Sequence, residues 1–444
     1  MRSLFRGAAG AALAALALLL PLRSAAAQAP LPAPVVQNST SPPDIPLLRL
    51  EDLLQEVPEN PSLRAAYMEA DALATRAAQV SALPDPMAMG TYQPFPVYTA
   101  RGTQRSQWRV EQQIPYPGKL SLQGDIADLS AEVAQWEAET FREDLTLQVK
   151  GFYYDLYRVQ QQLGLIEAFQ QRLMVFEDAA VTQYEVGTGM QQAVLKAQLE
   201  KNTLSQRIID LQARQRTAAE GLARVLNRPV EGAFAVRVAP PEPVAAGVER
   251  LVNLALEWRP EVEALEAAER RAEKSIDLAQ KQFMPDFGLN LTYFDMADRG
   301  AMPSVDGHDA VALGVSVKVP FQRGRLRAGL QEARLRAAQV QARQEALTTT
   351  FQTQIADLTN QLAREAEQMT LYRERLIPQA ETTLEATVSA YTTGRTDFLN
   401  LLDTERMLFS LQMGYEDALA RYLRAAAALE RAVGVGDLGT IDSL

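Results

Sequence analysis

The feature that most constrains this chain is a stretch of about 65 residues, 119–183, that has the pattern of one uninterrupted helix. Its apolar residues recur at steps of three and four, with a mean near 3.5, and no proline occurs within it. At 1.5 Å per residue, such a helix spans about 100 Å. The sequence therefore predicts a long helical rod, which other helices must match in length.

Two halves of the chain carry the same signals in the same order, which indicates an internal duplication. Tyr184 lies three residues before Gly187, and Tyr391 lies three residues before Gly394. Three proline-containing pairs also recur: Asn60-Pro61 and Arg259-Pro260, Leu83-Pro84-Asp85 and Met284-Pro285-Asp286, and Ile114-Pro115-Tyr116 and Val319-Pro320-Phe321. The offset between partners grows from 199 to 207 residues, as small loop insertions in a duplicated unit would cause.

Each repeat is predicted to contain a helix, two strands, a long helix and a shorter helix. The first repeat is expected at 47–230, with strands at 87–99 and 104–114, the long helix at 119–183 and the next helix at 190–226. The second is expected at 248–434, with strands at 286–294 and 310–319, the long helix at 326–390 and the next helix at 397–433. A linker, 231–247, joins the repeats, and a tail, 435–444, follows them.

The predicted strands alternate between apolar and small or polar residues. In the segment 310–319, Val311, Leu313, Val315 and Val317 share one face, while alanine, glycine, serine and lysine occupy the other. This pattern suits a strand with lipid on one side and a wet or packed lumen on the other, or equally the edge of a soluble sheet resting on a core. Four strands cannot close a barrel, and open edges are not tolerated in lipid, so membrane strands would require two or three chains to combine.

The N-terminus has the pattern of an export signal. Arg2 and Arg6 precede an apolar run from Ala8 to Leu20, and Ala25-Ala26-Ala27 offers a cleavage site, so 1–27 is predicted to be a signal peptide rather than a membrane anchor. A proline-rich leader, 28–46, follows. No later apolar run is long enough for a helical span. An exported chain of this kind is periplasmic, secreted, or placed in the outer membrane.

The composition argues against several classes of function. A net charge of −11 disfavours a nucleic-acid partner, because phosphate binding needs clustered lysine and arginine. The chain has no cysteine and one histidine, and it shows no acid pair or phosphate loop in a suitable context. We therefore expect no enzymatic activity, no cofactor and no metal site.

With these features in place, the sequence resembles the outer-membrane efflux (TolC) family of trimeric channel-tunnels, over about residues 46–434. The resemblance rests on the duplicated order, the proline pairs beside the strands, and the Val186-Gly187-Thr188 and Thr393-Gly394-Arg395 turns. It implies a mainly helical fold with a small β part and a homotrimer. Its antiparallel helical hairpins would form an α-barrel in the periplasm, and each protomer would give four strands to a twelve-stranded barrel in outer-membrane lipid.

The resemblance also implies site residues at the two turns, which would lie at the periplasmic tip. A helix reversal needs a residue with positive φ, which glycine supplies, and Thr188 and Thr396 could cap the following helices. Besides this turn chemistry, the turns are expected to dock a periplasmic adaptor; the residues concerned are Val186, Gly187, Thr188, Gly189, Gly394, Arg395 and Thr396. Asn400 and Asp403 occupy positions where the family constricts its pore, although Asp403 could equally be an ordinary solvated residue.

Pro378 falls inside the second long helix, where a proline removes a hydrogen bond. It predicts a kink near the tip, either a hinge for opening or a fixed bend that fits the curvature of the barrel.

The function expected from the resemblance is a passive outer-membrane exit duct that docks an adaptor and an inner-membrane pump of RND type. "PYPGKL", at 115–120, hints at the heavy-metal efflux branch. A type I protein secretion duct and a non-channel periplasmic trimeric coiled-coil scaffold remain alternatives.

Overall fold

The computed structural model describes residues 47–99, 102–187, 189–230, 235–238, 246–297 and 307–439. The predicted signal peptide 1–27, the leader 28–46, much of the linker 231–247 and Thr188 lie outside these ranges. The chain divides into two units, Met1–Ile45 and Pro46–Leu444. The elements below all belong to the second unit.

The first repeat contains α1 (Leu50–Glu56), the short 3-10 helix η1 (Val57–Glu59), α2 (Pro61–Ala74), α3 (Arg76–Ser81), α4 (Lys119–Glu185) and α5 (Gln191–Leu226). The second contains α6 (Val248–Trp258), α7 (Pro260–Lys281), α8 (Arg323–Leu371), the π-helical turn η2 (Tyr372–Leu376), α9 (Ile377–Thr392) and α10 (Phe398–Val433). The mainly helical character predicted from the sequence is confirmed.

Two matched prolines divide the helices that precede the strands. Asn60 and Arg259 have extended backbone, and Pro61 and Pro260 begin new helices. A proline disfavours the helical region for the residue before it and is well tolerated at the first helical position. The Asn60 side chain also caps α2, accepting hydrogen bonds from the backbone N–H groups of Ser62 and Leu63.

The predicted single helix at 326–390 is wrong in one respect, because the structure divides it. It begins earlier, at Arg323, and the π-helical turn η2 separates α8 from α9. Pro378 consequently lies in the first turn of α9 and not in a helix interior. The wider π turn accommodates the hydrogen bond that proline cannot donate.

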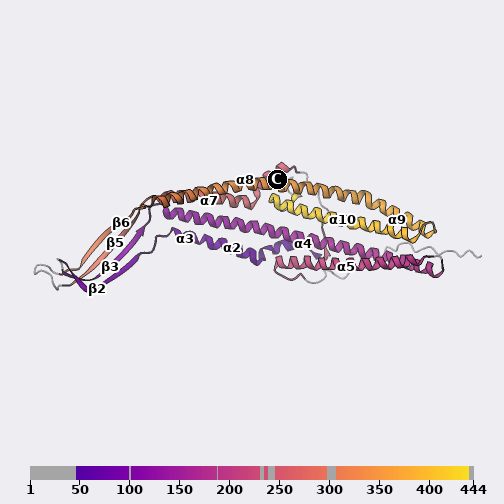
Figure 1. Ribbon diagram of the computed structural model, residues 1–444, viewed down its shortest axis with the longest axis horizontal. Coiled ribbons are helices and arrows are strands. Elements are labelled where there is room, and N and C mark those ends of the chain that lie inside the picture. Colours follow the sequence, from indigo (N-terminus) through magenta and orange to yellow (C-terminus); the bar gives the residue numbers. More distant parts are fainter. Residues whose placement is uncertain are drawn as a thin grey trace, which may run out of the picture. The chain divides into compact units, whose positions relative to one another are not determined.

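The main sheet has four antiparallel strands in the order β2-β3-β5-β6 (Figure 1). They are β2 (Met87–Thr99), β3 (Gly102–Ile114), β5 (Asp286–Ala297) and β6 (Ala310–Lys318). Pairing of β3 with β5 joins the two repeats, and β2 and β6 form the edges. Pro94 lies in β2, where the register shifts, as expected for proline in an edge strand. A small parallel sheet, β1 (Leu47–Leu48) and β4 (Ala235–Val236), lies elsewhere in the unit.

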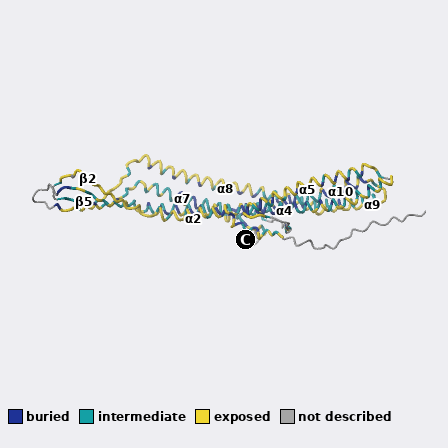
Figure 2. The backbone as a smooth tube through the Cα atoms, turned by 90° about the horizontal axis from the view of Figure 1, so that it is seen from below, coloured by how far each residue is buried: buried dark blue, intermediate teal, exposed yellow. Residues whose placement is uncertain are grey.

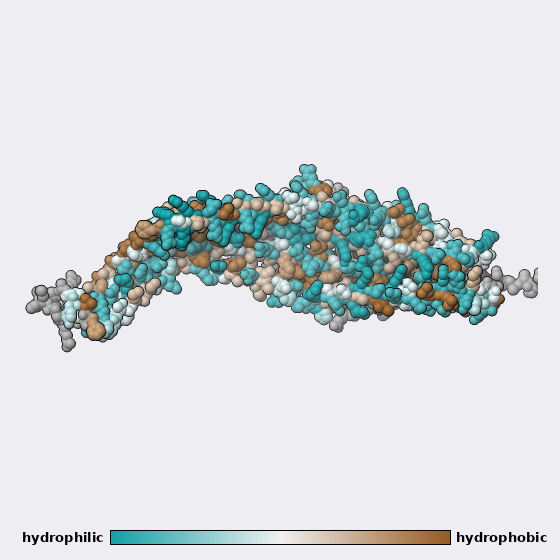
Figure 3. Space-filling view, viewed as in Figure 1, coloured by the Kyte–Doolittle hydropathy of each residue, from teal (hydrophilic) through white to brown (hydrophobic). Residues whose placement is uncertain are grey.

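The two faces of the main sheet differ sharply in chemistry. Leu291 lies opposite both Val110 and Leu313, and Tyr293 lies opposite both Trp108 and Val311, so these large apolar side chains share one face. All of them are exposed, Leu313 by 79 %. The other face carries small and polar residues, among them Gly288, Asn290, Thr292, Gly314 and Ser316. Brown apolar side chains near β5 and β6 contrast with the mostly teal helices in Figure 3.

The helices pack side by side in a single row, and different helices make up the row near the strands and far from them (Figure 1). Near the strands the order is α2 and α3, then α4, α7 and α8; further away it is α5, α4, α10, and then α8 and α9. The buried cores lie mainly where α4 meets α5 and α10, and α8 is largely exposed near the strands (Figure 2). Both borders of the row therefore lack a neighbour among the described residues.

Within the described ranges, no helix combines the length and apolar character needed to cross a membrane.

Candidate functional site at the helical tip

Two glycine turns end the helical hairpins at the end away from the strands (Figure 1). Gly187 has φ +76° and Gly394 has φ +70°, the left-handed region that favours glycine. Their N–H groups donate to the carbonyl oxygens of Tyr184 and Tyr391, each at 3.0 Å. A Cβ at either position would meet nothing within 4 Å. Backbone conformation, and not lack of space, therefore requires these glycines.

The two turns close differently after the glycine. In the second, Arg395 N–H donates to the Ala390 carbonyl at 2.8 Å, which completes a common helix-ending motif. In the first, the closing hydrogen bond comes from the second residue after the glycine, because Gly189 N–H donates to the Gln183 carbonyl at 2.8 Å. A Cβ on Gly189 would lie 2.9 Å from the Tyr184 nitrogen, so this second glycine is required by close packing.

The expectation that Thr396 caps the following helix is wrong. Asp397 is the cap of α10, because its Oδ1 accepts a hydrogen bond from the Asn400 backbone N–H at 3.0 Å. Thr396 Oγ1 instead accepts from Asn400 Nδ2 at 2.9 Å. The Asn400 side chain is thereby held against the turn. In the first hairpin, Met190 precedes α5 without a side-chain cap, and Thr188 lies outside the described residues.

The two turns contact one another around a cavity of about 240 Å³. Gln183, Gly189 and Met190 line it from the first hairpin, and Tyr391, Thr396 and Phe398 from the second. Phe398 is buried, and its ring meets that of Tyr391 edge-on at 6.3 Å. Phe398 also belongs to the core shared with α4 and α5, so the second hairpin is anchored to the first at the tip.

Asp403 lies on α10 with its side chain 69 % exposed. Arg406, one turn further on, approaches its carboxylate at 3.5 Å. The same arginine donates through Nε to Glu200 Oε2 on α5 at 2.8 Å, and Glu200 is buried. Asp403, the candidate constriction residue, is therefore the exposed end of a series of interacting charged side chains, Asp403, Arg406 and Glu200, that links α10 to α5.

A second ion pair crosses between the hairpins nearby. Arg172 Nε on α4 donates to both carboxylate oxygens of Glu405 on α10, at 3.1 and 3.2 Å. Glu405 is fully buried; burial raises the pKa of its carboxyl group, and the Arg172 charge opposes that rise. Sequence reasoning missed both pairs, although one signal was available. Glu405 follows Leu401 and precedes Leu408 at the spacing of the buried face, where an acid needs a partner.

The helix interruption before Pro378 lies against a glycine of α10. A Cβ on Gly414 would lie 2.8 Å from the Tyr372 hydroxyl, so any larger residue on α10 would require the ring of Tyr372, the first residue of η2, to move. The first hairpin has no such interruption, since α4 is continuous over 67 residues.

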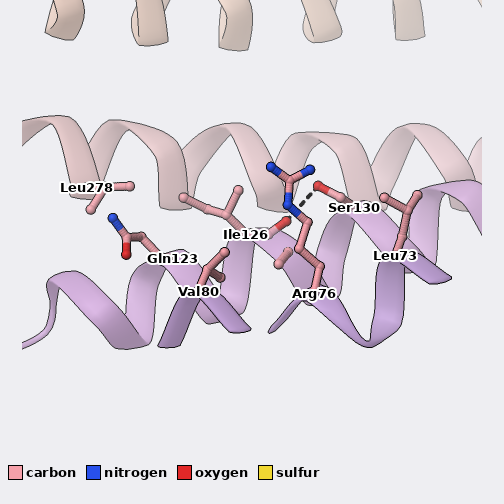
Figure 4. Close-up of a pocket in the computed structure, with 8 residues that line it drawn as sticks. Leu73, Arg76, Val80, Gln123, Ile126, Ser130 and Leu278 are labelled. Atoms are coloured by element: carbon pink, nitrogen blue, oxygen red, sulfur yellow. Dashed lines mark hydrogen bonds between the residues drawn. The ribbon is translucent and has the colours of Figure 1, made fainter. Parts of the chain in front are cut away.

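Figure 4 shows a separate groove of about 440 Å³ between α3, α4 and α7. Leu73, Val80, Ile126 and Leu278 project into it, and Arg76 is the one charged residue of its lining. Ser130 Oγ donates to the Ile126 carbonyl at 2.7 Å. A largely apolar groove with its hydroxyl already engaged offers no catalytic arrangement. Among the described residues, no group of three or more His, Cys, Asp or Glu side chains is placed to hold a metal ion.

Comparison with known proteins shows which family this chain resembles. The family model described as outer membrane efflux protein matches residues 251–435. The pyoverdine export outer membrane protein OpmQ of Pseudomonas putida is 26 % identical over 72 % of this chain and 63 % of its own length. The cobalt-zinc-cadmium resistance protein CzcC of Cupriavidus metallidurans is 22 % identical over 84 % of this chain and 87 % of its own. The alkaline protease secretion protein AprF of Pseudomonas aeruginosa is 25 % identical over 72 % and 70 %.

Solved structures agree with this assignment at the level of fold. The channel CusC covers 88 % of this chain and 93 % of its own, with a TM-score of 0.73 and 18 % identity. The family model covers the second repeat, while the relatives and the CusC structure extend over most of the chain. This chain is similar in sequence and in fold to outer membrane efflux proteins.

Proposed function

We propose that this protein is the outer-membrane exit duct of a tripartite efflux system. The observation that carries the proposal is the four-stranded sheet, which exposes a continuous apolar face and leaves β2 and β6 unpaired at its edges. Water disfavours such a face, and lipid does not tolerate unpaired edges. Both problems disappear if β6 of one copy pairs with β2 of the next in a closed barrel.

Three copies would supply twelve strands, enough for an open lumen, and this supports a homotrimer. The apolar face would then meet lipid, and the small and polar face would line the lumen. The row of helices, also open at both borders, would close in the same way into a helical barrel reaching into the periplasm. Export to the outer membrane by the predicted signal peptide, 1–27, belongs to the same proposal.

The tip turns are proposed to dock a periplasmic adaptor that links the duct to an inner-membrane pump of RND type. The described residues of this surface are Val186, Gly187, Gly189, Gly394, Arg395 and Thr396, and Thr188 is proposed with them.

Asn400 and Asp403 lie within a few turns of this docking surface. In a trimer, three copies of Asp403 would surround the axis and favour cations, with Arg406 partly balancing their charge. The bend before Pro378 is proposed to be fixed, since Tyr372 packs tightly on Gly414.

The relatives differ in cargo, because their names indicate pyoverdine export, metal resistance and protease secretion. We propose small-molecule or metal-ion efflux, with metal ions supported by CzcC, and type I protein secretion as the alternative supported by AprF. The cargo would pass through without chemistry in this protein. The duct would thus need neither cofactor nor catalytic residue.

Two neighbouring substitutions on opposite faces of β6 test the proposal. Leu313→Asp places a charge on the face proposed to meet lipid, and Ala312→Asp places the same charge on the lumen face. A charge facing lipid costs up to about 2 kcal/mol. We expect Leu313→Asp to reduce detergent-extractable outer-membrane trimer severalfold and Ala312→Asp to leave it near the wild-type amount. A wild-type protein found as a soluble periplasmic trimer would instead support the scaffold alternative.

A further inference from the structure

A concentrated patch of positive charge lies where the sheet meets the helices. Between Asp309 and Glu332 the chain has no acidic residue, but it has Lys318, Arg323, Arg325 and Arg327. In a protein with a net charge of −11, such a segment is locally distinct. We call these four cations, together with Phe321, the neck patch.

The neck patch is exposed, and its acidic neighbour is Asp286, which lies opposite Lys318 in the β5–β6 pairing. Lys318 and the three arginines are all exposed, and Phe321 is 84 % exposed. Among the described residues, no carboxylate forms an ion pair with any of the four cations. The nearby Asp286 is already engaged, because it accepts from Lys119 Nζ at 2.7 Å and from the Tyr116 backbone N–H at 2.9 Å.

The arginines at the start of α8 do not stabilise that helix. Cations near a helix N-terminus oppose the helix dipole, and the first turn of α8 has no acidic residue. By contrast, α6 and α7 carry glutamates in their first turns, and Asp397 caps α10. In the first repeat, the corresponding segment has one cation, Lys119, which is buried and paired. Arg323 lies over the Phe283 ring at 5.7 Å, and Arg325 lines a groove beside α4 and α7, but no carboxylate in the described part of the chain balances the charge of the arginines, and this excess of charge requires another explanation.

The position of the four cations along the length of the protein supplies an explanation. The exposed apolar side chains of β6 continue to Val317 and Val319, and Phe321 follows directly. Exposed aromatic residues at the end of an apolar strand mark a bilayer interface, and arginine and lysine at that level face lipid phosphates. A neighbouring copy paired with β6 would bring the β2 edge, and thus Asp85, toward the patch, but this is one carboxylate against four cations.

We propose that the neck patch binds the anionic phosphate headgroups of phospholipids, such as phosphatidylglycerol, in the periplasmic leaflet of the outer membrane. This inference rests on the outer-membrane placement proposed above. Lys318 and the two arginines that share a face of α8, Arg323 and Arg327, hold the phosphate groups, and Phe321 lies among the glycerol and upper acyl region. The contact fixes the depth of the barrel in the bilayer at the point where the helices begin.

The experiment measures lipid selectivity in reconstituted full-length protein. Spin-labelled phosphatidylglycerol and spin-labelled phosphatidylethanolamine are compared by the fraction that the protein immobilises in phosphatidylcholine bilayers at low and high salt. The wild type is expected to prefer phosphatidylglycerol by about threefold to tenfold at low salt, and less at high salt. Replacing Arg323, Arg325 and Arg327 by Gln should bring this ratio close to one.

A matched control removes the same charge elsewhere. Arg214, Arg216 and Arg224 are exposed on α5, away from the strands, and their triple change to Gln should keep the wild-type ratio. Equal immobilisation of both lipids by the wild type, or an unchanged ratio in the neck variant, would overturn the inference. Outer-membrane fractionation of the same proteins separates the two proposals. Wild type in the outer membrane without lipid selectivity refutes the neck patch alone, whereas wild type absent from the outer membrane refutes the proposed function.

Discussion

Glu416 on α10 provides the sharpest test of the electrostatics of the packed helices. Its carboxylate oxygen Oε2 is buried without a hydrogen-bond partner among the described residues. Burial, and secondarily the neighbouring Asp417 charge, raise the pKa of Glu416 from 4.5 to about 7. Tyr157 of α4 faces it, and the Glu416 charge adds to the rise in the pKa of that tyrosine. The folded protein therefore favours the protonated form of Glu416.

The raised pKa of Glu416 makes the folded state less stable at high pH than at low pH. A carboxyl group with a raised pKa in the folded state contributes stability below pH 4.5 and loses that contribution as pH rises through about 7. A shift of this size corresponds to about 3 kcal/mol for a fully buried group. Because Glu416 is only partly buried, we expect on the order of 1–2 kcal/mol.

Glu416→Gln keeps the neutral form at every pH. The variant should exceed the wild type in stability by that amount at pH 8, and the difference should vanish toward pH 4.5. Thermal unfolding in detergent, followed by circular dichroism from pH 4.5 to pH 8, measures it. Glu220→Gln, at an exposed position of α5, is the control and should keep the wild-type pH dependence. A stability difference for Glu416→Gln that does not change with pH would refute the reasoning.

Two further predictions concern the tip. Gly394→Ala forces a side chain into left-handed backbone and should lower stability by about 1–2 kcal/mol, whereas Gly324→Ala, in a helix with open space around it, should be neutral or stabilising; melting temperatures of the two decide this. Arg172→Met leaves the buried Glu405 unpaired and should cost about 2–4 kcal/mol, while adding Glu405→Leu should recover most of the loss. A double-mutant cycle by thermal unfolding measures this coupling, and purely additive losses would show that the two side chains act independently.

Much of the fold was accessible from the sequence because its signals are local. Proline-free periodicity over 119–183 corresponds to α4 at Lys119–Glu185, and alternation over 310–319 corresponds to β6 at Ala310–Lys318. The π turn η2 carries no such signal. Its residues, Tyr372–Leu376, are compatible with an ordinary helix, and the turn is associated with Pro378 downstream and Gly414 on another helix.

The features of the site likewise fall into two groups, those specified by local sequence signals and those that depend on how distant helices align. The positive φ of Gly187 and Gly394 follows from turn chemistry within a few residues, and sequence reasoning anticipated it. The choice between Thr396 and Asp397 as cap depended on where α10 begins, and helix boundaries are uncertain by a residue or two. Arg172 and Glu405 are 233 residues apart, so their pairing depends on how α4 and α10 align. No local pattern specifies that alignment.

The two hairpins share one turn design, yet the structure makes them mechanically unequal. The first is a continuous α4 packed with α5, and the second is divided by η2 on one arm and carries Gly414 on the other. Among the ion pairs between the hairpins, Arg172–Glu405 and Arg406–Glu200 lie on the tip side of that division, and Lys150–Glu430 and Arg431–Asp144 lie on its other side. The π turn replaces the i→i−4 hydrogen bonds by wider i→i−5 bonds over one turn, so the second hairpin carries a local irregularity that the first lacks. Divergence between duplicated hairpins is thus concentrated in the arm and in the crossing contacts, while the glycine turns themselves stay alike.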